Sequence, residues 1–368
     1  MTKQVWMIEK FATDKTSDVM SFTYSTGRRT QFDSWSPGSL VLTIKNDNGQ
    51  ANGYNLNDKI ILTAVGTYWY QWHYVQEVLY NDLGGDGAGS TATIVCTDLL
   101  GRLGRIQVFE KAIASQLTLQ QIDDEFETLL PSGTSIIING SGDSTAAADA
   151  SYSGTALNRF NLNMVTEQGW VSVTDDSIYL YGRSTIDDLG ASITFARTAS
   201  GVYQMGYSDI RRIALGSNYL NSCTATPPVA AAQNATDTAG VTTYGTYGAE
   251  FATVDQNAGQ ALGFAQWQVF SREDPDELSF QISVSDTAND LTELFNSIYY
   301  NEPLVTVSYK NPGSNTTLTD TQIMNGWSMS VNPSRTDMEI FTSPLTYTNF
   351  FTLNSATFGV LNTSRLGW

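Results

Sequence analysis

The residues of this chain that could do acid–base chemistry are carboxylates that occur as neighbours. Two opposed carboxylates are what a glycosidase needs, one to donate a proton and one to activate water or attack the sugar. Each acidic group here falls at an expected helix start, hairpin turn or helix end, where acids cap backbone N–H groups or face solvent. We therefore expect structural roles, and no enzyme activity, for these groups: Asp123-Asp124, Asp175-Asp176, Asp187-Asp188, and Glu273-Asp274 with Asp276-Glu277.

Nucleophile and metal chemistry is limited by the small number of histidines and cysteines. His73 is the only histidine, which excludes zinc sites that need two or three imidazoles. Its neighbours are typical of the middle of a strand, where we expect it to pack or to face solvent. Cys96 and Cys223 have no CxxC spacing, which excludes a disulfide framework. Cys96 alternates with Ala92 and Ile94, so we expect a small buried side chain there.

A glycine-rich run at 84–89 is a candidate for binding a phosphate or a cation. It lacks the Lys-Ser/Thr that follows the glycines of a phosphate loop, and it joins two expected strands rather than a strand and a helix. Asp82 precedes the run and Asp86 lies within it; both could touch a cation, but the spacing of a calcium-binding EF-hand loop is absent. We expect no cofactor and no metal site.

Composition excludes further classes of protein. The 368 residues include 19 Lys and Arg against 37 Asp and Glu, a formal net charge of −18. Such an excess of negative charge excludes a nucleic-acid binder that works by neutralising phosphates. No stretch approaches the roughly 18 consecutive apolar residues of a membrane span. The N-terminal MTKQVW does not begin an apolar run with a cleavage site, so we expect no export signal.

Most of the secondary structure that the patterns predict is β. Apolar alternation predicts a strand over 278–285, and the long strand over 68–80 is expected to carry Trp72, Tyr74, Val78 and Tyr80 on one face. The opening forty residues have an irregular, polar pattern. Further strands are expected over 40–44, 59–65, 91–96, 304–309 and 322–331. A helical turn over 97–103 is expected to be capped by Thr97 or Asp98, and further helices begin near Thr118, at Thr155 and at an N-terminal cap, Asp255.

The order of elements repeats within the chain. Residues 58–98 and 302–344 both run as a strand, a polar turn, a long Trp-bearing strand, a second turn and a closing strand. This repeat predicts two similar small β-barrels in a mainly β (α+β) fold. The expected parts are a first barrel (1–112), a mixed α/β peripheral domain (113–200), crossover strands with an Ala/Thr/Gly-rich loop that could return to the first barrel (201–254), and a second barrel with the C-terminal tail (255–368).

The C-terminal stretch 347–368 is apolar and aromatic and stops on a tryptophan. A segment of this composition must pack on its own domain or on a neighbouring subunit. The residues that we expect at a subunit interface are Phe350, Phe351, Leu353, Phe358, Leu361, Leu366 and Trp368.

Four stretches in order along the chain carry a family resemblance. They are SPGSLVLTIKND (36–47), TATIVCTDLLGRLGR (91–105), YSDI (207–210) with the later Tyr244-Gly245 and the helix from Asp255, and FTLNSATFGVLNTSRLGW (351–368). The last looks like the terminal signature of the minor tail, or tail hub, proteins of long-tailed (siphovirus-like) bacteriophages. The others resemble that family's first strand and turn, its strand-then-helix step and its central crossover.

The resemblance implies a fold similar to the baseplate hub of contractile-tailed phages, with two β-barrel tube domains and an inserted α/β domain in each chain. It implies a homotrimeric ring at the tail tip of the virion, assembled in the bacterial host cytoplasm, with DNA passing through an acidic lumen. The implied partners are the distal tail protein ring, the tape measure protein and tail fibre or receptor-binding proteins. Because catalysis in this family comes from appended lysozyme or peptidase domains, no catalytic residue is implied.

A carbohydrate-binding or carbohydrate-active β-protein, either a lectin or a glycosidase, is the alternative. The 8 Trp and 18 Tyr of the chain could stack on sugar faces, and the acidic pairs could act on them. Against this alternative stand the missing export signal and the absence of paired cysteines.

Overall fold

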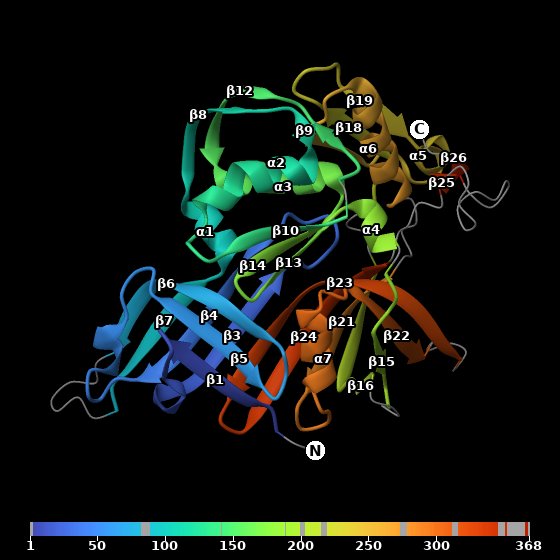
Figure 1. Cartoon of the computed structure of the whole chain (residues 1–368). Helices are drawn as coiled ribbons and strands as arrows, with labels where there is room; N and C mark the ends of the chain where they lie inside the picture. The colour runs from blue at the N-terminus through green and yellow to red at the C-terminus, as the bar shows by residue number, and fades with distance from the viewer. Residues whose placement is uncertain are drawn as a thin grey trace.

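The computed structural model describes residues 3–81, 89–140, 142–187, 189–198, 203–214, 219–272, 278–310 and 316–344, with the backbone of 350–351 and 365–366. Two strand-rich halves lie side by side at one end of the molecule (Figure 1). The helices α1 to α6 and several smaller sheets lie at the other end. The mainly β prediction is confirmed.

The first half is built from the N-terminal strands. Their order in the sheet is β3-β4-β7-β6-β5-β1-β2, and each neighbouring pair is antiparallel. The strands are β1 (Val5–Lys10), β2 (Thr13–Asp14), β3 (Val19–Gly27), β4 (Ser36–Lys45), β5 (Lys59–Val65), β6 (Tyr70–Asn81) and β7 (Thr91–Thr97), with short 3-10 turns η1 (Thr16–Asp18) and η2 (Gln50–Gly53).

The second half is built mainly from the C-terminal strands. Its order is β17-β21-β24-β23-β22-β15-β16, in which β15 pairs in parallel with both β22 and β16. The elements are β15 (Ile193–Ala196), β16 (Gln204–Gly206), β17 (Asp209–Ala214), β21 (Leu278–Ser285), α7 (Thr292–Tyr299), β22 (Leu304–Lys310), β23 (Thr317–Asn332) and β24 (Arg335–Pro344).

The two halves share one topology over five strands. The order β3-β4-β7-β6-β5 in the first half matches β17-β21-β24-β23-β22 in the second, and all of these pairs are antiparallel. The repeat read from the sequence is thus confirmed by strand pairing. Because β3 also pairs with β23, the halves form one 14-stranded sheet, and no described sheet closes into a barrel by strand pairing.

Alternation explains why matching strands bury matching positions. Leu40, Leu42 and Ile44 of β4 are fully buried, and Phe280, Ile282 and Val284 occupy the equivalent positions of β21. Side chains two apart on a strand point to the same face, so each strand presents one apolar face to the core. These residues join a single core cluster that spans both halves.

Both long strands carry a β-bulge at the same place. The pairing of β6 with β7 shifts between Val75 and Glu77, and the pairing of β23 with β24 shifts between Met324 and Gly326. A bulge moves the following residues to the other face of the sheet. The prediction that Trp72, Tyr74, Val78 and Tyr80 share one face is therefore wrong, because the bulge separates the first two from the last two.

The opening residues are more regular than their pattern indicates. They form β1 and β3, with Trp6 and Ile8 of β1 and Phe22 and Tyr24 of β3 buried in the core. Polar residues fill the outward positions of β3, which is central in the sheet, so its polarity reflects an open face rather than a loop.

The inserted part packs a layer of helices on short strands in a second core cluster. Asp98 caps α1 and Thr155 caps α3, as their patterns indicate, through bonds from the backbone N–H groups of Gly101 and Asn158. The elements are α1 (Leu99–Arg105), β8 (Gln107–Ile113), β9 (Gln116–Leu117), α2 (Thr118–Phe126), η3 (Glu127–Leu129), β10 (Ser135–Asn139), β11 (Thr145–Ala146), β12 (Asp149–Thr155), α3 (Ala156–Glu167), β13 (Trp170–Thr174), β14 (Ser177–Tyr181) and α4 (Arg183–Asp187).

A third unit holds a small sheet covered by one helix. Asn257, rather than the predicted Asp255, caps this helix, because its Oδ1 accepts a bond from the Gln260 N–H. Asp255 is instead buried beside Ala146. The domain limits 1–112, 113–200, 201–254 and 255–368 stay a prediction. The elements are β18 (Ser222–Thr226), β19 (Gln233–Thr236), α5 (Thr238–Tyr244), β20 (Gly248–Ala252) and α6 (Ala258–Phe270), followed near the C-terminus by β25 (Phe350–Phe351) and β26 (Arg365–Leu366).

Candidate functional site: the seam between the two halves

The pairing of β3 with β23 joins the two halves, and we call this pairing the seam. It contains six antiparallel residue pairs, from Gly326 opposite Gly27 to Val331 opposite Phe22. Tyr24, Trp327 and Met329 point into the core and are almost fully buried. Small hydroxyl side chains alternate with them and cover the other face of the seam: Thr23, Ser25, Ser328 and Ser330.

Two glycines face each other where the seam begins. Gly27 has a φ of +82°, a conformation that L side chains rarely adopt. A Cβ on Gly27 would overlap the carbonyl oxygen of Asn325, and a Cβ on Gly326 would overlap that of Thr26. The halves therefore approach so closely that neither position has room for a side chain.

An aromatic cluster lies directly under the seam. Trp69 is fully buried at its centre, with ring centroids 5.8 Å from Tyr24, 6.1 Å from Trp6, 5.4 Å from Phe295 and 5.6 Å from Trp327. The first two partners belong to the first half, and the last two belong to the second half. Aromatic rings in contact at these distances contribute a favourable energy in addition to that of their buried area. The cluster therefore stabilises the packing of the two halves against each other.

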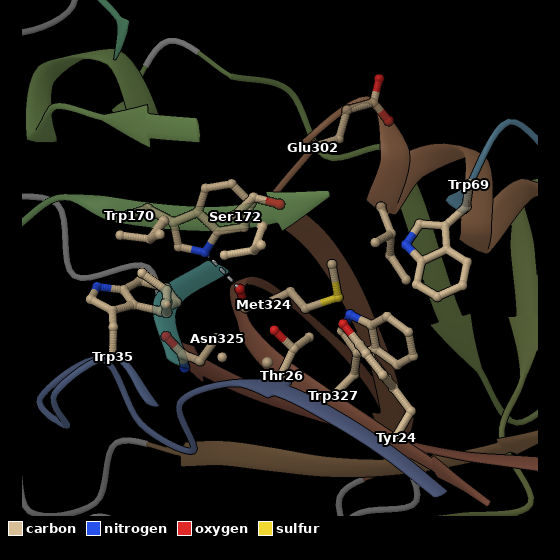
Figure 2. A pocket seen from close by; sticks show the side chains of 16 residues that line it. Tyr24, Thr26, Trp35, Trp69, Trp170, Ser172, Glu302, Met324, Asn325 and Trp327 are labelled. Atoms are coloured by element: carbon tan, nitrogen blue, oxygen red, sulfur yellow. Dashed lines mark hydrogen bonds between the residues drawn. The ribbon is translucent and has the colours of Figure 1, made fainter. Parts of the chain in front are cut away.

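The inserted part contacts the seam through β13 (Figure 2). The indole N–H of Trp170 donates a hydrogen bond of 3.0 Å to the carbonyl oxygen of Met324, next to the bulge of β23. A cavity of about 30 Å³ remains between Trp170, Trp35 and Trp327. That volume is close to the share of a single water molecule. At this contact the inserted part therefore packs closely against both halves.

The tryptophans that motivated the carbohydrate alternative are mostly core residues. Six of the seven that the structure describes are buried, and the half-buried seventh, Trp72, has the Lys59 ammonium 3.4 Å from its ring centroid. No described tryptophan therefore offers a free ring face of the kind that stacks on a sugar. The six buried ones are Trp6, Trp35, Trp69, Trp170, Trp267 and Trp327.

The acids and thiols singled out in the sequence are dispersed. Asp123 and Asp124 lie on α2, whereas Asp175 and Asp176 form the turn of the β13–β14 hairpin, as predicted. Asp187 ends α4, and Asp188, residues 273–277 and residues 84–88 of the glycine-rich run lie outside the described residues. Cys96 is buried, as expected. Over the described residues, no three His, Cys, Asp or Glu side chains gather in a way that could hold a metal ion.

Three buried aspartates make folding stability depend on pH. Burial raises the pKa of Asp98 and of Asp255 to about 6 and that of Asp175 to about 7. These folded-state values lie above the ordinary one, so the folded chain binds protons more tightly, and its stability falls as pH rises from about 4 to about 7. The buried His73 acts in the opposite direction below pH 6.5, because burial lowers its pKa to about 3.

We expect the unfolding free energy to be about 3 kcal/mol larger at pH 5 than at pH 8, since the three aspartates together outweigh the opposing effect of the one histidine. Thermal melts followed by circular dichroism at the two pH values measure this difference. Asp175→Asn should raise the melting temperature at pH 8 and flatten the pH dependence, because asparagine suits its positive φ of 55°. A protein that melts higher at pH 8 than at pH 5 would contradict the assignment.

The predicted interface residues of the tail fall mostly outside the described residues. Phe350 and Phe351 form β25, which pairs in parallel with Arg365 and Leu366 of β26. Leu353, Phe358, Leu361 and Trp368 lie outside the described residues. Their role between subunits stays a prediction.

Sequence reasoning missed the seam itself. Its residues lie at opposite ends of the chain, and no local pattern indicates that β3 pairs with β23. The signal that could have revealed it is the sequence Asn325-Gly326-Trp327, since a glycine inside an apolar strand often marks a bulge or a close backbone approach.

Comparisons of the sequence find no relatives. No family model matches the chain, and no curated protein sequence matches it.

Among the helices of the described residues, none is long and apolar enough to cross a membrane.

The fold, in contrast, matches solved structures over nearly its whole length. A tail protein from Neisseria meningitidis matches with a TM-score of 0.62 at 9% identity, covering 93% of this chain and 97% of that one. A 43 kDa tail protein of a Shewanella oneidensis prophage matches with a TM-score of 0.56 at 13% identity, covering 93% and 99%.

A third match extends the comparison to secretion systems. An Escherichia coli component of the type VI secretion system, described as structurally similar to the T4 bacteriophage tail proteins gp27 and gp5, matches with a TM-score of 0.53 at 7% identity, covering 92% of this chain and 76% of that one. The structural neighbours of the chain are thus phage tail proteins and a protein that resembles them. The chain has the fold of these tail proteins.

Proposed function

We propose that this chain is a structural component of a bacteriophage tail tip, in which three copies form a hub ring that continues the lumen of the tail tube. The observation that carries the proposal is the match of nearly the whole chain, with both of its similar halves, to phage tail proteins. Two halves of one topology per chain give a trimer six similar units, the number needed to continue a sixfold tube.

The proposed ring has an acidic lumen that lets DNA pass without gripping it. The net charge of −18 supports this, because a wall of carboxylates and amides repels phosphate. At physiological salt the screening length is about 8 Å, so the repulsion acts only near the wall. The proposed neighbours are the distal tail protein ring, the tape measure protein and the tail fibre or receptor-binding proteins, all assembled in the host cytoplasm.

Electron microscopy of the purified chain and of phage particles tests the proposal. We expect a ring with a central passage in the first sample and antibody label at the tail tip in the second. Label on the capsid, or a channel wall that is basic in a reconstruction, would contradict it.

Removal of residues 350–368 is expected to abolish ring assembly and to leave both halves folded, because this apolar segment is proposed to pack on a neighbouring copy. Light scattering coupled to size exclusion measures the mass, and circular dichroism with a thermal melt checks the fold. An unchanged oligomeric mass would refute the role of the segment.

A further inference from the structure

The shared topology gives five strands of one half an equivalent strand in the other. The bulges place Glu77 of β6 at the position of Gly326 in β23. The pairing of β4 with β3, and of β21 with β17, places Ile210 of β17 at the position of Phe22 in β3. Thus β6 corresponds to β23, and β17 corresponds to β3.

In the seam, β3 uses an edge of β23 that extends beyond the end of β22. The pairing of β22 ends at Ile323, and that of β3 begins at Gly326. In the first half, the pairing of β5 ends likewise at Tyr74, and β6 continues to Asn81. Among the described strands, none pairs with this free edge of β6, and none pairs with the outer edge of β17.

We propose that these two edges pair with each other between copies, so that β17 of one subunit adds to the free edge of β6 of the next, in the same way as β3 adds to β23 within a chain. This inference rests on the proposed ring function and specifies which two strands meet where neighbouring subunits of the ring touch. Transferring the register of the seam places Leu79 opposite Ile213, Tyr80 opposite Arg212, and Asn81 opposite Arg211.

The side chains at the two edges suit this register. Leu79 and Ile213 are 48% and 39% exposed, and an apolar cross-strand pair would cover both. Tyr80 is 50% exposed, and its ring would add a second aromatic contact to the guanidinium of Arg212, which already lies 5.6 Å from the ring centroid of Tyr309.

The occupant that we propose is a second copy, because the two edges match each other in register and lie far apart along the sheet of one chain. Along the sheet, β21, β24, β23, β3, β4 and β7 lie between β17 and β6. Exposed strand edges are templates for pairing, and repeated pairing of the second half with the next first half generates a closed ring when the steps are alike.

A disulfide between copies tests the register. In the double variant Leu79→Cys with Ile213→Cys, mild oxidation should give covalent dimers and trimers on a non-reducing gel. Disulfides need Cα atoms within about 7 Å, which the proposed pair satisfies. The off-register control, Leu79→Cys with Arg212→Cys, places the second thiol on the other face and should give no ladder. The native thiols Cys96 and Cys223 are buried and are present in both variants.

Native mass, measured in parallel, separates the two proposals. An assembled ring without the in-register disulfide, or with equal cross-linking off register, overturns the strand pairing and leaves the ring standing. A chain that stays monomeric overturns the ring function and this contact with it. A second variant, Ile213→Asp, should raise the concentration needed for assembly at least about tenfold without changing the melt of the monomer. An unchanged assembly concentration counts against the pairing.

Discussion

A Gly326→Val variant is expected to lose about 3 kcal/mol or more of unfolding free energy. Valine would put its Cβ on the carbonyl oxygen of Thr26 and within 2.9 Å of the backbone of Arg28. Both obstacles are backbone atoms of the opposite strand, so no rotamer change relieves the overlap, and the seam has to open. Urea unfolding followed by tryptophan fluorescence measures the loss, because Trp69 and Trp327 lie directly under the seam.

Ser330→Val is the matched control for that change. It lies on the same strand, four residues further on, and its side chain is exposed on the open face of the sheet. Since valine is well suited to strands, we expect a change within about 0.5 kcal/mol. Equal urea midpoints for the two variants would show that the close approach at Gly326 does not limit the stability of the seam.

Trp69→Ala is expected to cost about 3–5 kcal/mol, the usual range for removing a fully buried tryptophan. The cavity would open among rings from both halves, so both should become sensitive to protease together. Trp72→Ala, on the other face of the same segment and half-exposed, should cost about 1 kcal/mol and serves as the control. Cleavage confined to the first half of the Trp69 variant would contradict a role in fastening the halves.

The sequence predicted the structure best where apolar and polar residues alternate along a strand without interruption. The alternation over 278–285 predicts β21, which the structure contains. The repeat of 58–98 in 302–344 predicts two similar small β-barrels; the structure contains two halves of one strand topology, and neither closes into a barrel by strand pairing. Caps such as Asp98 and Thr155 were equally readable, because their hydrogen bonds reach only three residues along the chain.

The features that could not be predicted from the sequence depend on contacts between residues that are far apart along the chain. The bulge at Gln76 changes which side chains of β6 face the core, and no residue type at that point requires it. The strand β3 has a polar outward face that resembles a loop until its partners in the sheet are known. The seam joins the first and last parts of the chain, so its pairing follows from assembly of the whole core rather than from local pattern.

The separation of Gly27 from Gly326 has a consequence for synthesis. A ribosome adding about 5–20 residues per second takes roughly 15 to 60 s to travel from β3 to β23. During that interval one edge of β3 and the end of β6 have no strand paired to them. Because the two halves share one topology, the free β3 edge of one nascent chain can pair with the free β6 edge of a neighbouring nascent chain. Translation of this messenger by closely spaced ribosomes therefore favours premature mispairing, and widely spaced initiation or a chaperone that shields β3 protects the product.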